Sequence, residues 1–130
     1  MKKFMFLTVL FLFPLLAYPA DPVFEVLVDL ALQGQQQKTG FYLNSKSCLT
    51  SIKGSLHVAY DQKKDILIFG YYTSSTGMVK NYVWDRKEGK TSIISCKFDE
   101  QIDSKNAIKV SEREIQDSAL KFRTDWLSCK

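Results

Sequence analysis

Apolar and polar residues alternate in the middle of the chain with the period of short β-strands. Leu56, Val58 and Tyr60 occupy every second position of residues 55–60, and the residues between them are smaller or polar. This period of two is typical of a strand with one buried face. Three further strands are predicted after short polar turns, at residues 65–72, 78–84 and 90–98. Short strands joined by such turns predict an antiparallel meander.

The end of the chain changes to a helical period. Ser111 is followed three residues later by a glutamate, which is the pattern of an N-terminal capping box. Four apolar residues then follow at a spacing that keeps them on one helical face: Ile115, Ala119, Phe122 and Trp126. We therefore expect a helix over residues 112–127 that packs against the sheet.

The first part of the chain after residue 20 is less decisive. Residues 24–32 are strongly apolar and fit either a first strand or a short helix, and residues 34–40 are polar and fit a loop. The length of 130 residues allows one domain. The fold class expected is α+β, a curved antiparallel β-meander with one C-terminal helix packed on the sheet.

The first twenty residues have the layout of a secretory signal peptide. Two lysines near the start precede an apolar run over residues 4–16, and Ala17 and Ala20 offer alternative cleavage positions before the first acid. The run is shorter than the roughly 20 apolar residues that a spanning helix needs. We expect residues 1–20 to be a signal peptide and residues 21–130 to be a single secreted, extracellular domain with no stable membrane span.

Secretion favours a disulfide bond, and the chain has three cysteines, Cys48, Cys96 and Cys129. Loop entropy does not choose the pair, because the Cys48–Cys96 and Cys96–Cys129 loops each contribute about 4 kcal/mol. We predict a Cys48–Cys96 bridge, because Cys96 lies in a strand and Cys129 lies next to a terminus that can fray. The spare thiol is either buried or available to link two chains.

The sequence offers little for catalysis, metal binding or nucleic-acid binding. His57 is the only histidine and no CxxC motif is present, so we expect no metal and no cofactor. Asp61 and Asp65 flank a turn, where acids are usually solvated, and the acidic residues of 99–106 lack the spacing of an EF-hand loop. Without the two lysines of the first twenty residues, the chain has 16 basic and 14 acidic side chains, and this net charge of +2 is weak for a nucleic-acid binder. We expect a protein that is not an enzyme.

Aromatic residues are concentrated in the predicted meander. They are either the core of a small sheet or the wall of an apolar pocket. We take four of them as candidate ligand-binding residues: Phe69, Tyr71, Tyr82 and Trp84. The register of strand pairing is not readable from the sequence, so whether these four share a face stays open.

One stretch resembles a known family. Residues 54–61 read Gly-Ser-Leu-His-Val-Ala-Tyr-Asp, and a charged turn, an apolar strand, Tyr82, a Lys-Glu-Gly turn at residues 87–89 and Cys96 follow. This order resembles the N-terminal half of ependymins and related secreted proteins. The resemblance implies a fold similar to bacterial lipoprotein carriers, with a curved sheet around an apolar cavity, and an association with lipid and calcium.

Taken together, these features predict a secreted, non-enzymatic binding protein for an apolar small molecule or lipid. The alternative is a secreted protein-interaction factor, such as a toxin, inhibitor or effector, with a protein partner. An enclosed set of aromatic side chains favours the ligand, and an exposed continuous patch favours the protein partner.

Overall fold

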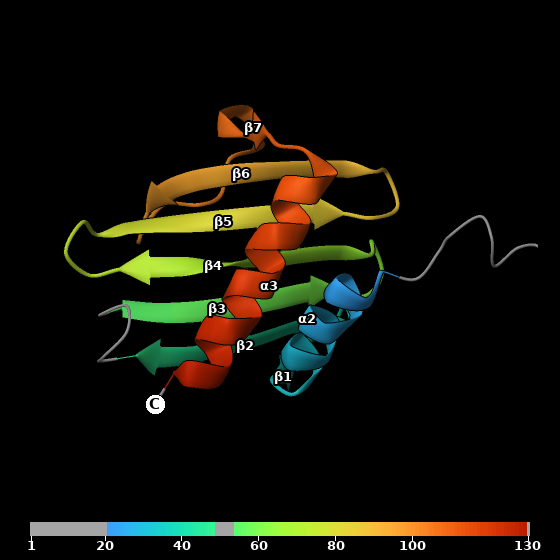
Figure 1. Ribbon diagram of the computed structural model, residues 1–130, viewed down its shortest axis with the longest axis horizontal. Coiled ribbons are helices and arrows are strands. Elements are labelled where there is room, and N and C mark those ends of the chain that lie inside the picture. Colours follow the sequence, from blue (N-terminus) through green and yellow to red (C-terminus); the bar gives the residue numbers. More distant parts are fainter. Residues whose placement is uncertain (1–20, 49–53, 130) are drawn as a thin grey trace, which may run out of the picture.

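The computed structural model describes residues 21–48 and 54–129. These residues form a seven-stranded antiparallel sheet in which strands adjacent in sequence are also adjacent in space (Figure 1). The strands are β1 (Gln35–Gln36), β2 (Phe41–Cys48), β3 (Gly54–Asp61), β4 (Ile66–Thr73), β5 (Met78–Asp85), β6 (Lys90–Lys97) and β7 (Ile108–Lys109). The predicted meander is confirmed, because β3 to β6 cover the four segments whose pattern indicated strands.

Two helices, α2 (Pro22–Leu32) and α3 (Glu112–Ser128), cover one face of this sheet (Figure 1). The apolar segment that fitted either a strand or a helix is therefore helix α2. Asp21 caps it, since its Oδ1 accepts hydrogen bonds from the backbone N–H groups of Val23 and Phe24 at 3.0 and 3.4 Å. The α+β prediction is confirmed, with a second packed helix added to the one expected.

Helix α3 has the start and the buried face that the sequence predicts. Ser111 is its N-cap, and its Oγ accepts a hydrogen bond from the backbone N–H of Glu114 at 3.0 Å. The helix buries the four apolar residues that the spacing placed on one face: Ile115, Ala119, Phe122 and Trp126. Helix α3 therefore crosses the sheet with its apolar stripe toward the strands.

Removing the Ser111 cap should destabilise the fold modestly. We expect Ser111→Ala to lower the free energy of unfolding by about 1 kcal/mol, because a backbone donor in the first turn of α3 loses its partner. Urea denaturation measures the change. Ser118→Ala, inside the same helix, is the matched control, and an equal loss in both variants would contradict a capping role.

The disulfide joins Cys48 to Cys129, with the two Cα atoms 5.2 Å apart, and Cys96 is a free cysteine. The predicted Cys48–Cys96 bridge is therefore wrong. Cys48 is fully buried on the face that the helices cover, whereas Cys96 lines a hollow on the opposite face. Helix α3 brings its last turn back over the end of β2, so the bridge ties the helix to the sheet.

The signal peptide predicted for residues 1–20 lies outside the described residues. Among the helices that the structure describes, none has the length and apolar character needed to cross a membrane.

Candidate functional site: a hollow on the open face of the sheet

The four candidate ligand-binding residues share one face of the sheet. Strand register settles this point, because β4 pairs with β5 so that Phe69 faces Tyr82 directly, and Tyr71 and Trp84 keep the same parity. This is the face that α2 and α3 cover. The four side chains therefore lie between the sheet and the helices.

These aromatic side chains pack against one another and against the helices. Phe69 is fully buried, with its ring stacked on Tyr82 at 5.0 Å and 5.3 Å from the ring of Phe122. Trp84 meets the ring of Phe24 edge-on at 5.1 Å. The set is thus part of the hydrophobic core, and Phe69 and Trp84 are inaccessible to a ligand in this arrangement.

Two members of the set also reach the border of α3. The Tyr71 hydroxyl donates a hydrogen bond to Asp125 Oδ2 at 2.8 Å. A hollow of about 310 Å³ beside α3 touches Tyr71 and Tyr82, but Lys80 and Lys121 also line it. With two lysines in its lining, this hollow beside α3 is poorly suited to an apolar molecule.

The opposite, open face of the sheet carries a hollow of about 440 Å³ over β2 to β6. Its lining is mostly apolar and comes from alternate residues of these strands and from the segment after β6. The lining residues are Phe41, Leu43, Ser45, Ser55, His57, Ala59, Ile68, Tyr72, Val79, Asn81, Cys96, Phe98, Glu100 and Ile102. We call this feature the open-face hollow.

The floor of the open-face hollow is a polar row across three strands. His57 on β3 and Asn81 on β5 both pair with Gly70 on β4, so the absent side chain of Gly70 lets them meet. His57 Nε2 lies 2.7 Å from Asn81 Oδ1, and Asn81 Nδ2 donates to the carbonyl oxygen of Ile94 at 3.3 Å. A Cβ at Gly70 would overlap the carbonyl oxygen of Lys80, so the gap in this row is obligatory.

The histidine of this row is half-buried on the open face of the sheet. Burial lowers the pKa of His57, and the weaker opposing effect of the Asn81 hydrogen bond does not restore it. The imidazole is therefore neutral at neutral pH. The sequence signal that was available is the period of β3, which puts His57 opposite Leu56 and Val58.

The segment after β6 forms one wall of the hollow. The ring of Phe98 packs on Tyr72 at a centroid distance of 4.8 Å. The side chain of Glu100 stabilises the turn of this segment, because its Oε1 accepts a hydrogen bond from the backbone N–H of Lys97 at 2.8 Å. Phe98 is 69% exposed and Ile102 is 45% exposed, so the wall presents apolar surface to solvent.

Cys96, His57 and Asn81 are residue types that thiol hydrolases use for catalysis. Their arrangement in space differs here from a catalytic one, because the imidazole does not contact the thiol. A nucleophilic thiol needs a base within hydrogen-bond reach. The Cys96 Sγ instead lies 3.9 Å from both Asn81 Nδ2 and the carbonyl oxygen of Glu100. Asn81 thus stands between the thiol and the imidazole, and this geometry does not activate the thiol.

Asp61 and Asp65, the two aspartates that flank the turn between β3 and β4, have separate structural roles. Asp61 caps a turn by accepting from the backbone of Lys63 and Lys64. Asp65, expected to be solvated, accepts hydrogen bonds from Arg86 Nε at 2.9 Å and from the Tyr60 hydroxyl at 2.7 Å. Arg86 also contacts Glu25 at 2.6 Å and so ties the β3–β4 turn to α2.

This cluster makes stability depend on pH at acid values. Burial alone would raise the pKa of Asp65, but the hydrogen bonds from Arg86 and Tyr60 outweigh burial and hold the pKa below its usual range. The ionised carboxylate is therefore favoured in the folded state. Its contribution is present above the unfolded pKa of about 3.8 and is lost as the pH falls through the lower folded value.

We expect Asp65→Asn to remove part of the acid sensitivity of the free energy of unfolding between pH 5 and pH 2. Asparagine tolerates the positive φ of 56° at this position, so the backbone is retained. Asp117→Asn, on the exposed side of α3, is the matched control. Equal pH profiles for Asp65→Asn and the parent protein, from urea denaturation at each pH, would contradict this role.

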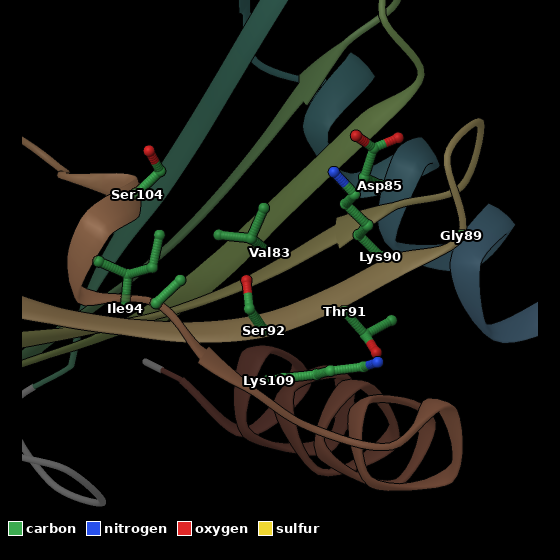
Figure 2. A pocket seen from close by; sticks show the side chains of 10 residues that line it. Val83, Asp85, Gly89, Lys90, Thr91, Ser92, Ile94, Ser104 and Lys109 are labelled. Atoms are coloured by element: carbon green, nitrogen blue, oxygen red, sulfur yellow. The ribbon is translucent and has the colours of Figure 1, made fainter.

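A second hollow, of about 450 Å³, lies where the 3-10 helix η2 (Ser104–Asn106) and β7 fold back over β6. Figure 2 shows Val83, Ser92 and Ile94 on one side of the sheet, with Ser104 beside them on η2. Six of its ten lining residues are polar or charged. It is therefore less suited to an apolar molecule than the open-face hollow.

The acidic segment after β6 uses its carboxylates locally. Asp103 caps η2 by accepting from the backbone N–H of Lys105 at 2.9 Å. Within the described ranges, no group of three or more histidine, cysteine, aspartate or glutamate side chains is placed to hold a metal ion.

Comparison of the chain with protein-family models, curated protein sequences and solved structures finds no match in any of the three. The relation to ependymins stays a prediction.

Proposed function

We propose that the protein is a secreted, non-enzymatic binding protein that holds an apolar small molecule or lipid in the open-face hollow. The observation that carries this proposal is the hollow itself, with an apolar wall and a few polar groups at its floor. Its volume of about 440 Å³ falls within the range of small-molecule sites, roughly 300–1,000 Å³. The site lies on the face opposite Phe69, Tyr71, Tyr82 and Trp84.

Other features support the same proposal. The Cys48–Cys129 bridge is typical of proteins from oxidising compartments, which supports secretion. The signal-like pattern of residues 1–20 and the resemblance to ependymins point in the same direction. Binding without catalysis is supported by the imidazole of His57, whose Nε2 is engaged by Asn81 and not by a nucleophile.

Titration with Nile red, an uncharged apolar dye, tests the proposal. We expect saturable binding that Ser45→Phe weakens at least about tenfold, because Ser45 lines the hollow and a phenyl ring there fills it. Ser47→Phe is the matched control, since Ser47 is exposed on the same strand and face, two residues away, and does not line the hollow. Absence of saturable binding, or an equal loss in both variants, would contradict the proposal.

The exposed wall favours a second candidate, a surface for a protein partner. Phe98, Ile102 and Leu43 are 69%, 45% and 40% exposed, and a protein would cover all three at once. A second copy of this chain is the simplest such partner. Sedimentation velocity of the parent protein and of Phe98→Ser tests it: dimers that disappear in the variant, together with no Nile red binding, would support protein interaction instead of a small ligand.

A further inference from the structure

We infer that the ligand of the open-face hollow is an uncharged apolar molecule with one hydrogen-bond donor, such as a long-chain or ring alcohol, and that His57 Nδ1 accepts its hydrogen bond. This inference rests on the proposed function and specifies the chemical class of the ligand. It follows from the tautomer of His57, the charge of the lining and the position of the polar row.

The hydrogen bonds of Asn81 determine where the proton of His57 lies. The carbonyl oxygen of Ile94 can only accept, so Asn81 must present its Nδ2 amide to Ile94. Asn81 then presents Oδ1, also an acceptor, to His57 Nε2 at 2.7 Å. The Nε2 atom must therefore carry the proton.

A neutral imidazole protonated at Nε2 has a lone pair at Nδ1. Burial lowers the pKa of His57 and so favours this neutral form. Asn81 is the hydrogen-bond partner of the ring, and no described residue donates to Nδ1. Since His57 lines the hollow, Nδ1 is an acceptor whose partner must be solvent or a ligand that carries an O–H or N–H group.

The charged residues around the hollow disfavour binding of an anionic ligand. Glu100 is charged, and no lysine or arginine occurs among the described residues that line the hollow. The other titratable groups in the lining are the neutral His57 imidazole, the Cys96 thiol and the Tyr72 hydroxyl. A fatty-acid carboxylate would place a second negative charge near Glu100 and would present only acceptors to Nδ1.

Three ten-carbon compounds that differ in their head group separate these possibilities. The compounds are decan-1-ol, decyl methyl ether and decanoate, each used to displace Nile red at pH 7.5. We expect the alcohol to bind about fivefold more tightly than the ether, because the ether lacks the donor. We expect decanoate to bind more than about tenfold more weakly than the alcohol.

Two substitutions test the role of Nδ1. In His57→Phe the acceptor is absent while an aromatic ring remains, so the preference for the alcohol over the ether should disappear. In His57→Gln the side-chain amide can donate to Asn81 and leave its oxygen as an acceptor, so the preference should be retained. Thermal denaturation of each variant checks that it is folded. If a variant does not fold, the relative affinities of the three compounds for the parent protein still test the inferred class of ligand.

The outcomes separate this inference from the proposed function. If Nile red and all three compounds fail to bind, both are overturned. If they bind but the ether matches the alcohol, or decanoate binds as tightly as the alcohol, the inference is overturned and the proposed function stands. A preference for the alcohol that persists in His57→Phe would also overturn the assignment of His57 Nδ1.

Discussion

Replacing Phe69 by alanine is expected to lower the free energy of unfolding by about 3–5 kcal/mol. Phe69 is fully buried at the centre of the helix-covered face. Its ring stacks on Tyr82 at 5.0 Å and lies 5.3 Å from the ring of Phe122 on α3, so alanine would leave a cavity between sheet and helix. Urea denaturation, analysed with a common slope for parent and variant, gives the change.

Phe98→Ala is the matched control for this experiment. Phe98 is 69% exposed on the other face, so its loss should change the free energy of unfolding by less than about 1 kcal/mol. Folded Phe69→Ala should still bind Nile red with the parent affinity, because Phe69 lies outside the open-face hollow. A stable Phe69→Ala protein that has lost Nile red binding would instead place the ligand between the sheet and the helices.

The second large effect is expected when the disulfide is removed. Cys48 and Cys129 are 81 residues apart, and closing a loop of this length contributes about 4–5 kcal/mol in the chain-entropy description. The double variant Cys48→Ser with Cys129→Ser should lose most of this stability in urea denaturation. The end of α3 should also become the first part of the helix to exchange its amide hydrogens.

Cys96→Ser is the control, and it should leave stability nearly unchanged because Cys96 makes only weak contacts through its sulfur. Peptide mapping without reduction checks the connectivity directly. A peptide that joins Cys48 to Cys129, with Cys96 alkylated before reduction, is expected. A bridge that contains Cys96 would contradict the structure.

Local pattern was sufficient for the meander and for α3. The period of two along β3, the polar turns between β3 and β6, and the spacing of Ile115, Ala119, Phe122 and Trp126 all reflect which side of an element is buried. The buried face of a strand or helix can be read from the spacing of apolar residues within that element alone. The capped start of α3 at Ser111 is local in the same sense.

Strand β2 shows where local pattern fails. Its inward positions include Asn44 and Lys46, which are polar and therefore do not produce an apolar alternation. Asn44 Nδ2 donates to the carbonyl oxygen of Leu30 at 2.8 Å, and Lys46 Nζ donates to that of Trp126 at 3.2 Å. These carbonyls belong to the last turns of α2 and α3. Asn44 and Lys46 therefore find these hydrogen-bond partners only when the helices pack on the sheet.

The sequence by itself determined the four central strands, the last helix and a concentration of aromatic residues in the meander. Only the tertiary structure decided which face the helices cover, which cysteine α3 brings to Cys48, and that Gly70 lets His57 meet Asn81. These decisions depend on strand register and on contacts between residues distant in the chain, such as His57 and Asn81, which are 24 positions apart. Local periodicity carries no information about such contacts, because shifting the register by one residue exchanges the two faces of a strand.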